Sequence, residues 1–167
     1  MEIKNSSQED LNDIMKLIHQ AKNYFKNAHI DQWQDGYPNE EAILNDISQN
    51  NSYVLIENNH VIATMFFSFD GEPTYTHIDG QWLTENPYVV IHRIVDDENQ
   101  KGKNIAGELL KFAIQKCEEK NIHSIRIDTH NDNHSMQKFL YKNGFELCGN
   151  ITLESGAPRI AFEKILA

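Results

Sequence analysis

Apolar residues in the first third of the chain fall three or four positions apart, with polar residues between them. This spacing runs through residues 11–25 and predicts a helix over 8–27. A shorter stretch of the same kind predicts a second helix over 39–49. Two later stretches predict further helices, at 105–120 and 133–143.

Runs rich in β-branched and aromatic residues, which favour strands, fill much of the remaining chain. They predict strands at 2–6, 52–57, 61–69, 88–95, 123–129, 145–153 and 158–166. Asn58 and Asn59 give a hairpin signal between two of these runs, because asparagine tolerates the turn conformation. The interspersed helices and strands indicate an α/β or α+β fold, with a single mixed, mostly antiparallel sheet flanked by helices.

The length and charge of the chain limit its class. A chain of 167 residues fits one domain spanning 1–167. No apolar run approaches the ~20 residues that cross a bilayer, and the amino terminus lacks the apolar core of a signal peptide. We therefore expect a cytoplasmic protein with no membrane partner. A net charge of −10 argues against a nucleic-acid partner, which usually needs a basic face, and is compatible with a cationic small substrate.

Cysteines and histidines give no sign of a metal site. Cys117 and Cys148 lie in a predicted helix and a predicted strand, so we expect buried thiols in a reducing cytoplasm rather than a disulfide. His77, His130 and His134 lack ligand spacing with cysteines or carboxylates, and no metal is predicted.

The stretch "ENQKGKNIAGELLKF", residues 98–112, connects a predicted strand to a predicted helix. Backbone N–H groups of such a loop, together with the positive end of the helix dipole, can bind an anion. An ordinary strand-to-helix connection is the alternative. The stretch is neither a P-loop nor a dinucleotide fingerprint, because the repeated glycines of those motifs are missing.

The second half of the chain, from "IHRIVDDENQKGKNIAGELL" to "NHSMQKFLYKNGFELCG", resembles the acetyl-CoA-binding core of the GNAT superfamily of N-acetyltransferases. That superfamily has a loop of the form Arg/Gln-x-x-Gly-x-Gly/Ala, then a helix, a strand, an asparagine and a Gly-Phe pair. The matching positions here are Lys101, Asn104, Ala106, Asn133 and Gly144-Phe145. The resemblance covers about residues 88–150, and "QWQDGYPNEE" also resembles small bacterial members without a defined substrate.

The resemblance implies the GNAT acyl-CoA acyltransferase fold and acetyl-CoA as co-substrate. It implies that Asn133 holds the cofactor by its side chain and that three strand residues pair with its pantetheine arm, namely Ile94, Val95 and Asp96. The pyrophosphate is expected on the loop formed by Lys101, Gly102, Lys103, Asn104, Ile105, Ala106 and Gly107.

Some positions depart from the superfamily pattern. Asn104 stands where glycine is usual, but asparagine is the next most tolerant residue of a positive φ angle, so the loop can still close. Asp96 is expected to turn its side chain away from the phosphates. Many members carry a tyrosine seven residues after the asparagine as the acid that protonates the leaving thiolate. Here that position is Leu140, and Tyr141 follows it, turned by about 100° on a helix.

Catalysis requires a neutral amine, since a lysine-type amine with a pKa near ~10.4 is unprotonated in only about one molecule in a thousand at neutral pH. His92 is the first candidate base, and Glu98 and Asp128 are weaker ones. A structural role in the strand is the alternative for His92. Strict alternation would put Arg93 on the opposite face of the strand. Tyr141 is the candidate acid, with surface packing as its alternative.

Aromatic residues gather in two loop regions, around 30–37 and 75–88. They could line an acceptor pocket for a cation or an apolar chain, although core packing and loop anchoring are equally ordinary roles. The predicted substrate-facing residues are Trp33, Tyr37, Tyr75 and Trp82, with Tyr88 beside them. The long connection 70–87 is itself more typical of a functional loop than of an idle one.

The sequence therefore predicts an acetyl-CoA-dependent N-acetyltransferase that acts on a primary amine by direct attack in a ternary complex. The partner is a small-molecule amine or a peptide amine. A non-catalytic acyl-CoA sensor of the same fold and a protein or peptide acetyltransferase are the alternatives. A homodimer through an exposed strand or the 70–87 connection is a further expectation, because dimers are common in the resembled superfamily.

Overall fold

Eight strands form one mixed sheet in the computed structural model, which describes residues 1–167. The strand order is β1-β2-β3-β5-β6-β8-β7-β4. Strands β5 and β6 pair in parallel, whereas the pairs β1–β2, β2–β3, β6–β8, β7–β8 and β4–β7 are antiparallel. The predicted mixed, mostly antiparallel sheet flanked by helices is confirmed.

The elements follow the predicted pattern closely. The helices are α1 (Leu11–Asn27), α2 (Glu40–Ser48), α3 (Ile105–Glu119) and α4 (His134–Lys142). The strands are β1 (Glu2–Asn5), β2 (Ser52–Glu57), β3 (His60–Ser68), β4 (Asp79–Gly80), β5 (Val89–Asp96), β6 (Ser124–Thr129), β7 (Glu146–Thr152) and β8 (Pro158–Ile165). Short 3-10 turns are η1 (Gln8–Asp10), η2 (Pro73–Tyr75) and η3 (Glu98–Gln100).

The chain divides into two compact units, and β5 and α3 each contribute to both. The first unit contains residues 1–67 and 92–115, and the second contains 68–91 and 116–167. The expectation of a single domain stays a prediction, and the units are described separately below.

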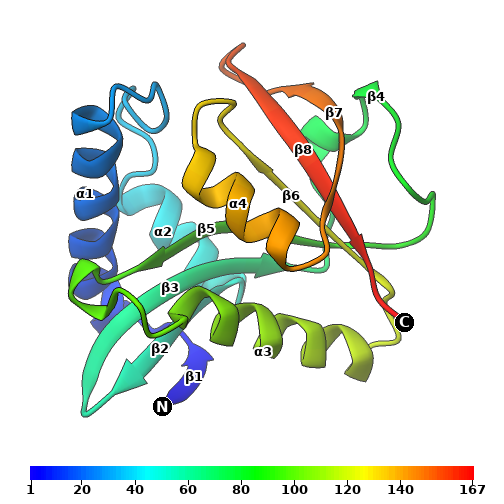
Figure 1. Ribbon diagram of the computed structural model, residues 1–167. Helices are drawn as coiled ribbons and strands as arrows, with labels where there is room; N and C mark the ends of the chain where they lie inside the picture. The colour runs from blue at the N-terminus through cyan, green and yellow to red at the C-terminus, as the bar shows by residue number, and fades with distance from the viewer. The chain divides into compact units, whose positions relative to one another are not determined.

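The first unit has helices on both faces of its strands. Ile18 of α1 and Ile43 of α2 belong to one buried cluster with Val54 of β2. The neighbouring residue Tyr53 points to the opposite face, where its ring lies 5.4 Å from that of Phe112 in α3. Figure 1 accordingly shows α3 in front of β2 and β3, with α2 behind them. Alternation along β2 thus lets one strand support two helical layers.

The β2–β3 hairpin turns on Asn58 and Asn59, which have φ angles of 51° and 64°. Positive φ at both central residues is the requirement of a type I′ turn, whose twist matches that of the strands. The hairpin predicted from these two asparagines is confirmed, with His60 already in β3.

The second unit contains β6, β8, β7 and β4, together with α4 (Figure 1). Gly144 ends α4 with a φ angle of 82°, as predicted for a helix cap. The long connection after β3 contains η2 and the two-residue β4, which pairs with β7. A Cβ atom on Gly80 would lie 2.2 Å from the Cys148 carbonyl oxygen, so this pairing requires glycine.

Both cysteines are free. Burial raises the pKa of the Cys117 thiol to about 12, with a smaller contribution from the charge of Glu118. Cys148 was expected to be buried but is only half-buried, because it lies in β7 near the edge of the sheet. No helix is long and apolar enough to cross a membrane.

Candidate functional site

The segment Lys101–Gly107 forms an open turn that leads into α3. Gly102 and Asn104 have φ angles of 83° and 54°, which confirms that asparagine takes the conformation usually left to glycine. Of the seven backbone N–H groups in this segment, only that of Lys103 has an acceptor within the chain, the carbonyl of Gln100. The others, including the first N–H groups of α3, remain available to an anion.

A side chain from α1 clamps the start of this loop. Gln20 donates from Nε2 to the Asp96 carbonyl oxygen at 2.9 Å and accepts from the Glu98 N–H at 3.1 Å. On the other side, the Asp97 N–H donates to the carbonyl oxygen of Ile62 in β3 at 2.8 Å. The first residues of the loop after β5 are therefore bonded to α1 on one side and to β3 on the other. The pKa of the Asp96 carboxyl is raised, mainly by burial.

The Asn104 side chain lies over the first turn of α3. A Cβ atom on Gly107 would come within 2.4 Å of the Asn104 Oδ1 atom. Gly107 therefore leaves the space that the Asn104 amide fills. This pair explains how the loop accommodates asparagine at a position where the resembled pattern has glycine.

The strand β5 has a local break at Arg93, whose φ angle is 52°. A positive φ in a strand interrupts the alternation of side chains. The His92 ring centroid lies 5.4 Å from that of Phe66, and the Arg93 guanidinium lies 5.0 Å from the same ring. The expected alternation of His92 and Arg93 to opposite faces is therefore wrong.

Arg93 connects three elements of the first unit. Its guanidinium donates to a carboxylate oxygen of Asp46 in α2 and to the phenol oxygen of Tyr37 in the α1–α2 connection. Both side chains of the Arg93–Asp46 ion pair are largely buried. The pKa of Asp46 is raised by burial, against the lowering effect of the Arg93 charge. His92 also lowers it, which places the imidazole within electrostatic reach of this pair.

The predicted aromatic residues of the first unit have different environments. Tyr37 is 46% exposed and is held through its hydroxyl by Arg93. Trp33 is partly buried and packs edge-on against Phe25, with ring centroids 5.5 Å apart. Arg93 thus contacts Tyr37 and the unpredicted Phe66, and Phe66 in turn contacts His92. Trp33 instead packs toward the core.

The predicted aromatic residues of the second unit anchor a loop. Tyr75 is only 2% exposed, and its hydroxyl donates to the Asp128 carboxylate at 2.7 Å. The Trp82 ring lies 5.2 Å from that of Tyr75, and its indole N–H donates to the Tyr75 carbonyl oxygen. Arg126 stacks on both Trp82 and Tyr88, about 4 Å from each ring. Tyr75 has almost no surface left for an acceptor.

Asn133 and Tyr141 lie at either end of α4. Asn133 is 5% exposed, and its Oδ1 atom accepts from the Met136 N–H at 3.2 Å, so this residue caps the helix. Tyr141 is 54% exposed and packs edge-on against Phe162, with centroids 5.5 Å apart.

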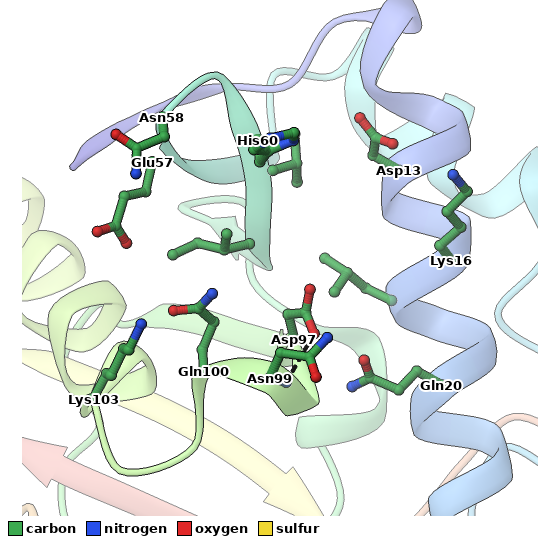
Figure 2. A pocket seen from close by; sticks show the side chains of 13 residues that line it. Asp13, Lys16, Gln20, Glu57, Asn58, His60, Asp97, Asn99, Gln100 and Lys103 are labelled. Carbon is green, nitrogen blue, oxygen red and sulfur yellow. Dashed lines mark hydrogen bonds between the residues drawn. The ribbon is translucent and has the colours of Figure 1, made fainter.

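A cavity of about 450 Å³ lies within the first unit, between α1, the β2–β3 hairpin and the loop after β5. Figure 2 shows Glu57 and Lys103 on one side of it, Asp13 and Lys16 on the other, and Gln100 between them. A smaller cavity is lined by Asp46, Phe66 and Arg93 among others, and the two cavities share no lining residue.

The sequence profile described as the acetyltransferase (GNAT) family matches residues 17–145. The chain belongs to the GNAT family. It is 31% identical to a GNAT-family acetyltransferase from Streptococcus agalactiae, over 99% of this chain and 95% of that one, with a TM-score of 0.88. No curated protein matches the chain.

Two further solved structures share the fold. One is a GNAT-family acetyltransferase from Listeria monocytogenes, 18% identical over 99% of this chain and 94% of that one, with a TM-score of 0.76. The other is the PaiA N-acetyltransferase from Thermoplasma acidophilum in complex with coenzyme A, 20% identical over 98% of each chain, with a TM-score of 0.73. Membership of the GNAT family supports an acyltransferase activity for this protein.

Three residues beside the predicted GNAT positions were not predicted: Gln20, Asp46 and Phe66. Gln20 and Asp46 lie within apolar stripes of their helices, next to Leu17 and Ile43. A polar residue on the inward face of an amphipathic helix is the signal that was available. No group of three or more metal-ligating side chains is present.

Proposed function

We propose that this GNAT-family protein transfers the acetyl group of acetyl-CoA to a primary amine by direct attack in a ternary complex. The observation that carries the proposal is the set of unpaired N–H groups in Lys101–Gly107 at the start of α3. Backbone donors at the positive end of a helix suit a pyrophosphate. Gly102 adds open space, because nothing lies within 4 Å of a Cβ atom built on it.

The residues present fit the cofactor that the family implies. Lys101–Gly107 would hold the pyrophosphate, and backbone groups of Ile94–Asp96 would pair with the pantetheine arm. One lone pair of the Asp96 carbonyl is already used by Gln20. Asn133, whose Oδ1 atom caps α4, is proposed to add a side-chain contact to the cofactor. When bound, acetyl-CoA supplies the activated thioester.

The acceptor side is proposed to lie at the break in β5. His92 would remove a proton from the ammonium or relay it through water, so that the amine nitrogen can attack the thioester carbon. The C–N bond forms, the second amine proton passes to water, the C–S bond breaks, and the leaving thiolate takes its proton from Tyr141 or from water. Phe66 beside His92 and the half-exposed Tyr37 are proposed to contact the acceptor body, together with Trp33 and Trp82, whereas the buried Tyr75 holds the loop through Asp128.

Calorimetric titration with acetyl-CoA tests the cofactor assignment. We expect wild-type binding with a Kd on the order of micromolar. Asn104→Pro should weaken it at least about tenfold, because proline removes an N–H group and cannot adopt φ of 54°. Asn104→Gly is the matched control, since glycine keeps the positive φ, and it should bind nearly as wild type. Failure of the wild type to bind would overturn the assignment.

Turnover distinguishes an enzyme from a sensor of the same fold. Release of free thiol from acetyl-CoA would be followed with small amines, polyamines, amino acids and peptides as acceptors. Acetylation of an amine without an acetylated enzyme in the intact mass spectrum supports direct attack. Tight acetyl-CoA binding with no release for any acceptor would favour the sensor, and turnover of peptides alone would favour a protein acetyltransferase.

A further inference from the structure

The peptide group between Asp96 and Asp97 lies where β5 ends and the loop begins. It is hydrogen-bonded at both of its ends. Its carbonyl oxygen accepts from Gln20 Nε2 at 2.9 Å, and its N–H donates to the carbonyl oxygen of Ile62 at 2.8 Å. Because the C=O and N–H groups of a trans peptide point in opposite directions, these two bonds fix the orientation of the peptide plane.

The Gln20 amide uses its acceptor as well as its donor. Its Oε1 atom accepts from the Glu98 N–H at 3.1 Å, which belongs to the next peptide group of the chain. Figure 2 shows the Gln20 side chain pointing from α1 toward Asp97 and Asn99. The side chain is half-buried and gives up rotamer freedom to make both bonds. One side chain of α1 therefore holds two successive peptide groups of the loop.

From these two peptide groups, hydrogen bonds continue through η3. The Asp97 carboxylate accepts from the Asn99 N–H at 2.9 Å, and the Asp97 carbonyl oxygen accepts from the Gln100 N–H at 2.8 Å. The Gln100 carbonyl oxygen in turn accepts from the Lys103 N–H at 3.2 Å. This is the only backbone hydrogen bond made by residues 101–103, so the direction of the loop depends on the residues that precede it.

We propose that Gln20 is a positioning residue for cofactor binding, an inference that rests on the proposed function. By holding the end of β5, Gln20 sets the direction of the N–H groups of Lys101–Gly107 before the pyrophosphate binds. A loop that is already ordered binds its ligand more tightly, because less conformational entropy is lost on binding. Gln20 acts through the backbone of the loop, and no contact with the reacting atoms is assigned to it.

Calorimetric titration with coenzyme A measures the effect. Gln20→Met keeps a side chain of similar length but has no N–H donor and only a weak acceptor. Its Kd for coenzyme A should be about tenfold higher than that of wild type. Lys22→Met is the matched control, because Lys22 also donates from α1 to a backbone carbonyl, that of Pro38 at 2.8 Å, and not to the loop. Its Kd should equal that of wild type.

Steady-state kinetics separates positioning from a general loss of structure. Gln20→Met should raise the KM for acetyl-CoA about tenfold and leave the KM for the acceptor within about twofold of wild type. A urea titration shows whether both variants are folded under the assay conditions. Equal increases in the two KM values, or a Kd for coenzyme A that Lys22→Met weakens as much as Gln20→Met, would overturn the positioning role.

NMR without the cofactor tests the contact itself. The Glu98 amide proton should exchange faster with solvent in Gln20→Met than in wild type, because its acceptor is lost. The ¹⁵N order parameters of Lys101–Gly107 should fall in the same variant and stay unchanged in Lys22→Met. Unchanged exchange at Glu98 together with unchanged order parameters would overturn the inference.

The two proposals fail in different ways. Wild-type affinity for coenzyme A in Gln20→Met would overturn the positioning role alone. Absence of coenzyme A binding to the wild-type protein would overturn the proposed function, and the positioning role with it.

Discussion

Two arginine–carboxylate pairs, one in each compact unit, use the same chemistry in different surroundings. Glu163 is fully buried and accepts from the Leu83 N–H and the hydroxyl groups of Thr84 and Ser124, besides its ion pair with Arg126. Asp46 has Arg93 as its single side-chain partner. The Glu163 carboxylate thus accepts three hydrogen bonds and the Asp46 carboxylate accepts one, while the buried Arg126 Nε atom, 3.4 Å from Glu163, has no hydrogen-bond partner.

The difference concerns what surrounds each arginine. Around Arg126, the rings of Trp82 and Tyr88 and the carbonyl of Thr84 add contacts that hold the connection after β3. Around Arg93, Tyr37 is 46% exposed, so part of its ring faces solvent. Beyond the ion pair, Arg93 has one further side-chain hydrogen bond, to Tyr37, and Asp46 has none, so the pair contributes little to stability and we regard it as the better candidate for function.

Glu163→Gln is the strongest way to break the anchoring pair. It leaves the Arg126 charge buried without a counterion, and we expect a loss of about 3–5 kcal/mol in unfolding free energy. Urea denaturation measures it. Glu146 is an exposed glutamate that lies opposite Glu163 in the β7–β8 pair. As the control, Glu146→Gln should change the unfolding free energy by less than about 0.5 kcal/mol. A loss below about 1 kcal/mol for Glu163→Gln would contradict the role given to this network.

Gly149→Ala tests the second attachment of the same connection, the β4–β7 pairing. The added Cβ atom would lie 2.2 Å from the Asp79 carbonyl oxygen, at a φ angle of 153°. We expect a loss of about 2–3 kcal/mol, because backbone must move to relieve the clash. Gly156→Ala serves as control, since its site also has a positive φ but open space, and the loss should be smaller. Equal losses would mean that strain, not close approach, decides.

Tyr37→Phe is the mildest break of the Arg93 cluster. The ring stays and one hydrogen bond to Arg93 is lost, so stability should fall by about 1 kcal/mol or less. If Tyr37 lines the acceptor site, KM for the acceptor should rise about tenfold while the Kd for acetyl-CoA stays unchanged. Steady-state kinetics measures the KM for the acceptor, and calorimetry measures the Kd for acetyl-CoA. Equal changes in KM and Kd would contradict an acceptor-side role for Tyr37.

Asp46→Asn tests the Arg93 pair through the pH dependence of the unfolding free energy. Burial raises the folded-state pKa of Asp46 above its usual 3.8, so the folded protein binds this proton more tightly than the unfolded chain. The stability contributed by that proton is fully present below pH 3.8 and is lost as the pH rises through the folded pKa. The stability advantage of wild type over Asp46→Asn should therefore shrink with rising pH. An advantage that grows with pH would show that the Arg93 charge outweighs burial.

Much of the fold follows from local sequence. Asn58 and Asn59 predict their hairpin, and Gly144 predicts the end of α4, because each residue suits one backbone conformation. The two-residue β4 was not predicted, since its pairing depends on glycines 80 and 149 meeting from distant parts of the chain. For the candidate site, the positive φ of Asn104 was correctly expected from the resemblance, which has glycine at this position, and from the tolerance of asparagine for that conformation.

The sequence by itself determined the helices, every strand except β4, and the mixed sheet of this GNAT-family protein, because these depend on periodicity and on conformational preferences of single residues. Only the tertiary structure decided which side chains meet. The break at Arg93 brings His92 and Arg93 to the same ring of Phe66, and Gln20 reaches the loop across 76 residues. Such contacts depend on where separate elements pack, and no local pattern encodes that position.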